Sequence, residues 1–147
     1  MFMKTHTVKA SEIKERWYVV DASNRPLGRL ASEVANALRG KHRPEFSPHL
    51  SLGDHVIIVN ADKIYLSGNK RENRLYYRFS GYPGGLKAKT MRDVIADDPT
   101  NVVRLAVRRM LPRTRLGRRM MKKLKIYAGP EHPHSAQKPE GMPPTGY

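Results

Sequence analysis

The sequence predicts an α/β fold, with a small, mainly parallel sheet of about four strands flanked by helices, basic loops and an extended C-terminal tail. Two short apolar runs, 17–22 ("WYVVDA") and 55–61 ("HVIIVNA"), are rich in aromatic and β-branched residues, which is typical of strands buried on both faces. An amphipathic helix pattern lies between them. A strand, a helix and a strand within about forty residues indicate a βαβ unit with parallel strands.

The connecting helix is predicted over 27–39. Its apolar residues recur at helical spacing along one side, and the polar residues fall on the other. Pro26 is suited to the start of a helix, and Gly40 is a natural stop. This segment should therefore lie with its apolar side on the sheet.

The remaining elements are shorter. A third strand is predicted over 75–80, followed by a short helix in "TMRDVIADDP" that ends at Pro99. A stronger helix should run over 102–111, with Thr100 as its cap and Pro112 after its end. The stretch "RTRLGRRMMKKL" is typical of a broken basic helix, and "KIYAG" of a final strand.

The organisation predicted along the chain is one α/β domain over 17–129, with an N-terminal extension over 1–16 and a proline-rich tail over 130–147. A chain of 147 residues is long enough to bury a modest core. The tail is expected to run extended across a surface without forming an element of its own.

Positive charge dominates the composition. Lys and Arg number 28 against 13 Asp and Glu, which gives a net charge of +15, and residues 99–130 contain ten of these cations and no acidic residue. Such an excess favours a polyanionic partner, nucleic acid first and an anionic membrane second. The chain has no cysteine, no long apolar run and no signal-peptide core near its start, so we expect a cytoplasmic protein without membrane contact or thiolate metal sites.

The most basic tract is 113–125, in which seven of thirteen residues are cationic. Leu116, Met120 and Leu124 form a stripe at a spacing of four. This pattern fits a membrane-surface helix, a calmodulin target or an RNA-binding helix docked on its own core. RNA is favoured because no acidic residue offsets the charge, because arginine suits phosphate, and because the stripe lacks Trp and Phe.

A second candidate is the glycine-rich stretch 80–90, "SGYPGGLKAKT". The backbone at Gly84 and Gly85 could lie against a phosphate or ribose, Tyr82 could pack on a base or sugar, and Lys87 with its neighbour Lys89 could neutralise charge. The alternative is a plain glycine-rich hairpin or loop with the tyrosine packed in the core.

Enzymatic and metal-binding interpretations have weak support. The turn "DASNRPLGRL" lacks a dinucleotide or phosphate-loop motif, so Asp21 and Asn60, at the ends of strands, are better explained as caps. His132 and His134, with only Glu131 near them, form a poor ligand set, and packing or RNA stacking explains them better. We expect no catalytic residue, no metal, no cofactor and no small-molecule substrate.

Dispersed basic loops without a known DNA-binding or RNA-binding motif indicate a folded RNA recognised by its shape. Five stretches then become specific: "VVDASNRPLGRLAS", "LRGKHRPEFSPH", "GDHVIIVNADKI", "YYRFSGYPGGLK" and "AVRRMLPRTRLGRRMMKKLKIYAGPEHPHSAQKPE". In this order they resemble the bacterial L thirteen family of large-ribosomal-subunit proteins, from about Trp17 to Glu140.

The resemblance implies an α/β fold and a structural, non-enzymatic role on large-subunit ribosomal RNA, early in assembly and beside other large-subunit proteins. A translational regulator that binds messenger RNA and, with less support, a nucleotide-dependent enzyme remain alternatives. RNA-facing residues carried over from the family are Lys41, His42, Arg43, Tyr82, Gly84, Gly85, Lys87, Arg113, Arg115, Arg118, Arg119, Lys122 and Lys123. The nearby cations Arg78, Lys89, Arg108 and Arg109 complete the predicted RNA-binding set.

Overall fold

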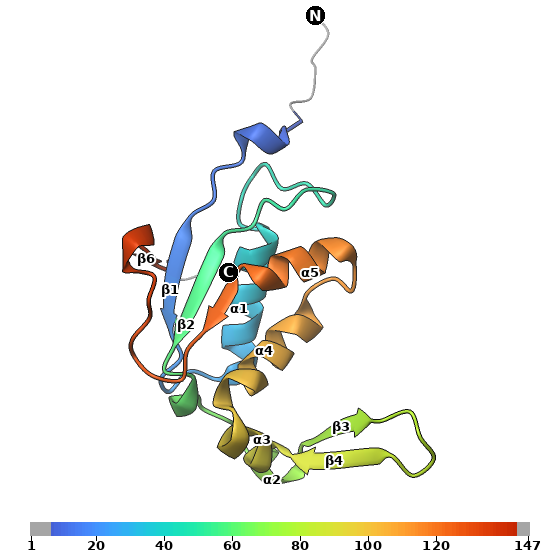
Figure 1. The fold of residues 1–147 in the computed structure, drawn as a ribbon. Helices are drawn as coiled ribbons and strands as arrows, with labels where there is room; N and C mark the ends of the chain where they lie inside the picture. Colours follow the sequence, from blue (N-terminus) through green and yellow to red (C-terminus); the bar gives the residue numbers. More distant parts are fainter. Residues whose placement is uncertain (1–6, 144–147) are drawn as a thin grey trace, which may run out of the picture.

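The fold is an α/β arrangement around a four-stranded parallel sheet, seen in a computed structural model that describes residues 7–143 (Figure 1). The strands are β1 (Trp17–Asp21), β2 (His55–Val59), β5 (Leu124–Ile126) and β6 (Glu140–Gly141). Their order is β5-β2-β1-β6, and each neighbouring pair is parallel. The predicted fold class and the βαβ unit are confirmed.

Three helices pack against one face of this sheet: α1 (Leu27–Arg39), α4 (Pro99–Met110) and α5 (Arg115–Lys122). The β1–β2 register pairs Val20 with Ile58, and both side chains belong to the main core cluster together with residues of all three helices. Fully burying a large aliphatic side chain contributes about 1.5–3 kcal/mol, so this cluster accounts for much of the stability of the domain.

Helix α1 begins and ends where the sequence predicts. Gly40 follows it in the left-handed conformation, with φ of 78°, and its N–H donates to the carbonyls of Asn36 and Ala37. A Cβ atom at Gly40 would lie 2.9 Å from the backbone carbon of Leu52. Glycine is needed here both for the turn and for the close approach of the loop that returns to β2.

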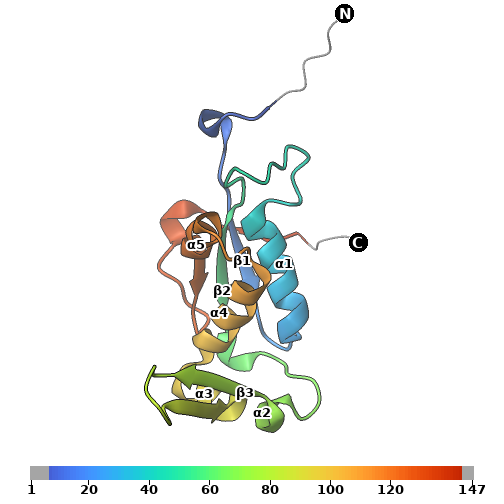
Figure 2. The ribbon, with the colours of Figure 1, turned by 90° about the vertical axis from the view of Figure 1, so that its right-hand side faces the viewer.

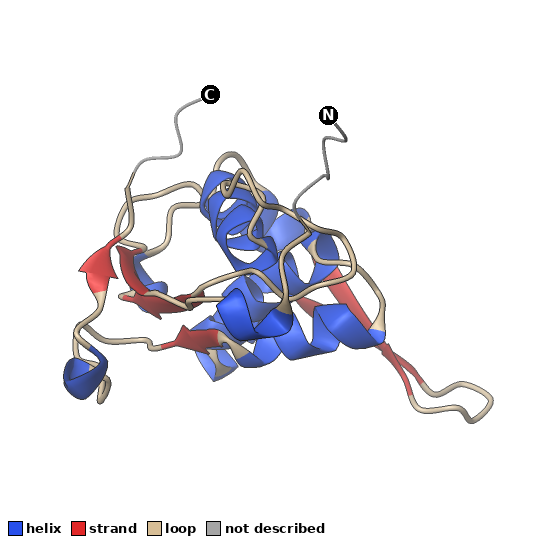
Figure 3. Cartoon of the chain, turned by 90° about the horizontal axis from the view of Figure 1, so that it is seen from above, coloured by secondary structure: helices blue, strands red, loops and turns tan. Residues whose placement is uncertain are grey.

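The second part of the fold is a small subassembly at one end of the molecule. It contains α2 (Lys70–Asn73), β3 (Leu75–Phe79), β4 (Leu86–Thr90) and α3 (Met91–Asp97). β3 and β4 form an antiparallel hairpin separate from the main sheet, and Figure 3 shows it projecting from the body. The strand predicted over 75–80 exists, whereas its partner β4 was not predicted.

The start of α4 corrects one prediction. The cap is Asp98, whose Oδ1 accepts hydrogen bonds from the N–H of Thr100 at 2.9 Å and from its hydroxyl at 2.7 Å, so Thr100 is a donor inside the first turn. Pro99 occupies the first helical position, where a missing N–H costs nothing. The hydrogen bond from the Thr100 side chain lowers the pKa of Asp98 and keeps the cap ionised.

The C-terminal tail completes the sheet. Glu140 and Gly141 form β6 beside β1, and the N–H of Met142 donates to the carbonyl of Val19 at 3.2 Å. The sequence predicts no element here, and the difference arises because two residues are too few to show a strand pattern. Short 3-10 turns occur at Ala10–Glu12, Ala61–Lys63 and Ser135–Gln137.

Candidate nucleic-acid interface

Helix α5 is docked on the core by its apolar side. Met120 is almost fully buried, and Leu116 packs against the same core cluster that contains Leu124 of β5. The apolar stripe seen in the sequence is therefore covered by the protein itself, and a membrane-surface helix loses the face that it would insert. The side chain of Thr114 caps the helix by accepting from the N–H of Gly117 at 3.2 Å.

The opposite side of α5 is a cationic surface without acidic partners. Arg115, Arg118, Arg119 and Lys122 are all exposed, and within residues 7–143 no carboxylate is paired with any of them. The connection before the helix adds the exposed Arg113. We call Arg113, Arg115, Arg118, Arg119 and Lys122 the α5 basic face. Four of its five members are arginines, whose planar guanidinium groups bind phosphate with two hydrogen bonds.

Close packing at Gly117 fixes the position of α5, and this leads to a first prediction. A Cβ atom at Gly117 would lie only 1.9 Å from the carbonyl oxygen of Pro112, a backbone atom that cannot move aside without shifting the connection. Gly117→Ala is expected to lower the free energy of unfolding by about 1–3 kcal/mol in urea denaturation. Gly129→Ala is the matched control, because nothing lies within 4 Å of its Cβ position. Equal free energies of unfolding for the two variants would contradict the close packing of Gly117 against Pro112.

The loop between α1 and β2 is held by the buried carboxylate of Asp54. Its Oδ1 accepts from the N–H of Arg16 at 2.9 Å and from Nη2 of Arg43, and its Oδ2 lies 3.1 Å from Nε2 of His42. Of the three residues predicted from "GKHRP", Arg43 is thus directed toward the protein interior, His42 contacts Asp54 but remains partly exposed, and Lys41 is exposed.

Lys123 is also directed inward. Its Nζ donates to Oε1 of Glu15 at 2.8 Å and to the carbonyl of Gly53 at 2.8 Å, and its side chain is only 12% exposed. Glu15 further contacts Nε2 of His55 at 2.7 Å. Burial raises the pKa of Glu15, but the hydrogen bonds from Lys123 and His55 outweigh it and hold the pKa below its usual value.

The glycine-rich stretch forms the turn of the hairpin. Gly81 and Gly84 have φ of 91° and 73°, a conformation that side chains disfavour, and the N–H of Gly85 donates to the carbonyl of Tyr82 at 2.9 Å. The Tyr82 side chain is 75% exposed. The alternative of a tyrosine packed in the core is therefore wrong, although the glycine-rich hairpin itself is present.

The two faces of the hairpin differ in chemistry. Arg78 is paired across the strands with Lys87, so two cations lie on one face. The other face carries Tyr77 opposite Ala88 and Phe79 opposite Leu86, and both rings are about two-thirds exposed. Lys89 shares the cationic face and forms an exposed ion pair with Asp97, with Nζ and Oδ2 2.7 Å apart.

On α4, Arg108 and Arg109 are exposed in the last turn, and no carboxylate of residues 7–143 is paired with either.

In Figure 1 the loop after α1, the α4–α5 connection and the hairpin turn all lie toward the right-hand side of the molecule, and Figure 2 looks directly onto that side. The predicted cations are therefore gathered on several projecting segments, with the loop at one end and the hairpin at the other.

The residues considered for catalysis have structural partners. Asp21 Oδ1 accepts from the N–H and hydroxyl of Ser23 and from Nδ2 of Asn60, at 2.8–2.9 Å. The backbone hydrogen bond from Ser23, followed by the one from Asn60, lowers the pKa of Asp21. This carboxylate ties together the ends of β1 and β2, which is the capping role that the sequence favours.

The histidines near the tail are packed among aromatic rings. Trp17 is stacked on His55 with ring centroids 4.2 Å apart, and Nε2 of His134 lies 2.8 Å from the hydroxyl of Tyr127. Over residues 7–143, no group of three or more potential ligands is placed to hold a metal ion. The same part of the chain has no helix of the length and apolarity needed to span a bilayer.

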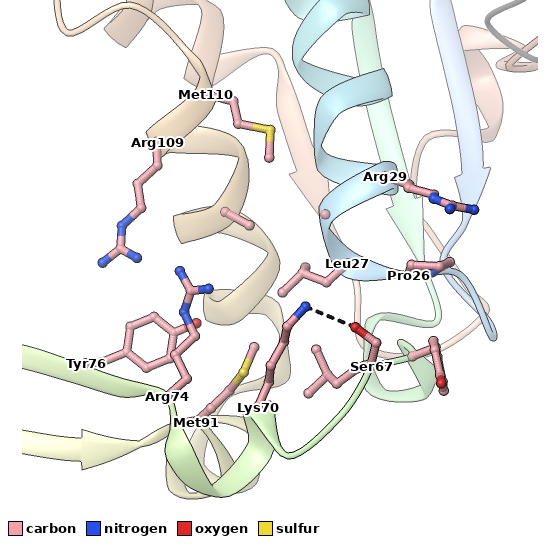
Figure 4. A pocket seen from close by; sticks show the side chains of 14 residues that line it. Pro26, Leu27, Arg29, Ser67, Lys70, Arg74, Tyr76, Met91, Arg109 and Met110 are labelled. Carbon is pink, nitrogen blue, oxygen red and sulfur yellow. Dashed lines mark hydrogen bonds between the residues drawn. The ribbon is translucent and has the colours of Figure 1, made fainter.

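Sequence reasoning overlooked two further cations, Lys70 and Arg74, which line a pocket at the base of the hairpin together with the predicted Arg109 (Figure 4). Lys70 belongs to the turn "SGNKREN" and Arg74 follows it directly, and mixed charges there resemble an ordinary solvated loop. What distinguishes them is that no Asp or Glu lines the pocket, which a single sequence does not reveal.

Comparison with known proteins identifies relatives over nearly the whole chain. The family model described as Ribosomal protein L13 matches residues 15–133. The "Large ribosomal subunit protein uL13" of Roseiflexus castenholzii is 57% identical over 142 residues, covering 97% of each chain. The proteins with the same name from Aquifex aeolicus and Symbiobacterium thermophilum are 55% and 58% identical, each covering 95% of this chain and 97% of the relative.

Proposed function

The chain belongs to the ribosomal protein L13 family, and we propose that it acts by clamping large-subunit ribosomal RNA with the α5 basic face, the hairpin and the exposed cations of α4. The relatives support a structural constituent of the large ribosomal subunit in the bacterial cytoplasm, and not an enzyme. Its partners are accordingly ribosomal RNA and other ribosomal proteins.

The α5 basic face is the observation that carries this proposal. A helix with its apolar side buried in its own core and its exposed side free of carboxylate partners offers a rigid row of phosphate ligands. Long arginine side chains on a fixed helix lose less freedom when they bind than they would on a mobile loop. Charge neutralisation by such a face is the general basis of affinity for nucleic acids.

The hairpin extends the same contact to a distant part of the RNA. Arg78 and Lys87 meet phosphates from one face, and the backbone at Gly84, with open space where a Cβ would be, permits close approach at the turn. Tyr82, exposed at the turn, packs on a base or a ribose.

Two of the predicted RNA ligands have a different part in the proposal. Arg43 and Lys123 hold the segments around Asp54 and Glu15, so they set the shape of the loop that presents Lys41. Their contribution to RNA binding is through this positioning, since the hydrogen bonds that their side chains donate go to groups of the protein itself.

Neighbouring proteins of the subunit complete the proposed surroundings. The apolar face of the hairpin exposes Tyr77, Phe79 and Leu86 by 61–65%, which is unusual for side chains in contact with water alone. Because this face carries no cation, an apolar surface of an adjacent ribosomal protein is its most suitable partner, while the cationic face remains on RNA.

Regulation of translation through messenger RNA would use the same cations, and co-sedimentation tests the choice between the two functions. The protein is expected to sediment with large ribosomal subunits from a gentle lysate, and the RNA recovered with it should be large-subunit ribosomal RNA. A variant with glutamine at every residue of the α5 basic face should shift toward the unbound fraction. Recovery mainly with messenger RNA away from ribosomes would overturn the proposal in favour of the regulator.

A further inference from the structure

A pocket of about 360 Å³ lies at the base of the hairpin (Figure 4). It is enclosed by α2, by β3, by the start of α1 and by the last turns of α4. Its volume is near the lower end of the range for small-ligand sites, roughly 300–1,000 Å³. It would therefore hold one compact ligand. None of the residues predicted to bind RNA lines this pocket except Arg109.

The polar part of the pocket is cationic. The guanidinium carbons of Arg74 and Arg109 lie 5.9 Å and 5.6 Å from the centre of the Tyr76 ring, so one aromatic side chain holds both groups. Lys70 Nζ is held by a hydrogen bond of 3.0 Å to the hydroxyl of Ser67. No Asp or Glu lines the pocket, and within residues 7–143 no carboxylate is paired with these three cations.

The remaining wall is mainly apolar, although Arg29 of α1 also lines it. Met91 is 1% exposed, and Leu27 packs against both the main core cluster and the smaller cluster that contains Met91. Ala106 adds a small side chain from α4. Three cations opposite an apolar wall suit a ligand that has an anionic group on one side and a flat apolar group on the other. Inorganic phosphate would leave the apolar wall unused.

We infer that this pocket binds a single nucleotide of the ribosomal RNA that is turned out of the base stack. Its phosphate contacts Arg74, Arg109 and Lys70, and its base packs between Tyr76 and the apolar wall. Stacking of a base on an aromatic side chain is favourable and needs no particular base. The inference rests on the proposed function, because the nucleotide belongs to the RNA already held by the α5 basic face.

The test compares two double variants of the full-length protein on a large-subunit ribosomal RNA fragment. Arg74→Gln with Tyr76→Leu removes a cation and the ring from the pocket. Arg39→Gln with Phe46→Leu makes the same changes at an arginine–aromatic pair outside the pocket, where the Arg39 guanidinium carbon lies 5.6 Å from the centre of the Phe46 ring. Melting temperatures of both variants are measured first, and RNA binding is compared only where at least 90% of the protein is folded at the assay temperature. If less than 90% of the pocket variant is folded at the assay temperature, Arg74→Gln alone is used in its place.

The expected result is a loss of affinity of about 10- to 100-fold for the pocket variant, with the control near wild type. Chemical probing of the RNA should show one unpaired nucleotide whose base is protected by wild-type protein and by the control, but becomes reactive with the pocket variant. A loss of affinity without a change at any single base would overturn the inference, since the cations would then be ordinary phosphate contacts. Equal affinity of the two variants would overturn it as well.

A free nucleotide shares the chemistry of the proposed ligand, so adenosine monophosphate is titrated against the same proteins. Weak binding, abolished in the pocket variant and outcompeted by the RNA fragment, supports the inference. Tight, saturable binding that the RNA does not displace would assign the pocket to a free nucleotide instead. Failure of wild-type protein to bind the RNA fragment at all would overturn the proposed function, and this result is distinct from a specific defect of the pocket.

Discussion

Replacing Arg115, Arg118, Arg119 and Lys122 with glutamine is expected to lower the affinity for large-subunit ribosomal RNA by about 10³-fold near 0.1 M salt. Each of the four side chains is exposed on α5 and without a carboxylate partner among residues 7–143, so its charge is available to a phosphate. The measurement is a binding titration repeated over a range of salt concentrations.

The salt dependence is the more specific readout of this prediction. If the wild-type protein neutralises about eight phosphates, its affinity should fall by three to five orders of magnitude between about 50 mM and 200 mM salt. Removing four contacts should reduce the slope of log affinity against log salt by about three to four units. A flat response of the wild-type protein, or an unchanged slope in the variant, would exclude the electrostatic mechanism.

Two controls separate charge from structure. Glutamine has a helix propensity close to those of arginine and lysine, and Leu116 and Met120 still anchor the helix, so the melting temperature should change little. Replacing Arg115, Arg118 and Arg119 with lysine keeps the charge. It should therefore preserve the salt slope, and any loss of affinity then measures the paired hydrogen bonds that guanidinium groups make.

The sequence was sufficient for those parts of the fold whose evidence is local. The apolar side of α1, the stop at Gly40 and the two buried runs of β1 and β2 are each visible within a short window, and the structure has them at the predicted places. The apolar stripe of α5 was equally visible, and its burial in the core argues against a membrane-surface helix.

Elements that depend on distant partners were not predicted. Strand β4, "LKAKT", has two lysines and two small residues, and only its pairing with β3 reveals a strand. Strand β6 exists because the edge of β1 offers it hydrogen bonds. The two strands are far apart in the sequence, since 119 residues separate Asp21, the last residue of β1, from Gly141, the last residue of β6. A single sequence shows neither partner.

The candidate site follows the same rule. Exposure of the α5 basic face could be predicted from its helical spacing, since the apolar stripe fixes which side turns outward. In contrast, Lys123 meets Glu15 across 108 positions, and Arg43 meets the buried Asp54 across a loop. Charge counting treats all of these cations alike, whereas the fold separates those that position the backbone from those that remain free for RNA.

Asp54→Ala is expected to give the largest loss of stability among the variants considered, about 3–5 kcal/mol in the free energy of unfolding. The side chain is fully buried, and its removal leaves the half-buried guanidinium of Arg43 and the N–H of Arg16 without their carboxylate. Urea denaturation measures the change. Asp62→Ala is the matched control, because this residue is exposed and the substitution is expected to change stability by less than about 0.5 kcal/mol.

Arg43→Met then decides whether this arginine positions the loop or binds RNA. If it acts by positioning, the variant should lose stability because Asp54 keeps a buried charge with fewer partners, while the salt slope of RNA binding changes by much less than one unit. Lys41→Met, at the exposed end of the same loop, should show the reverse pattern, with normal stability and a slope lower by about one unit. A full unit of lost slope for Arg43→Met with unchanged stability would assign this residue to a phosphate, because an arginine that only holds Asp54 cannot release counterions from RNA.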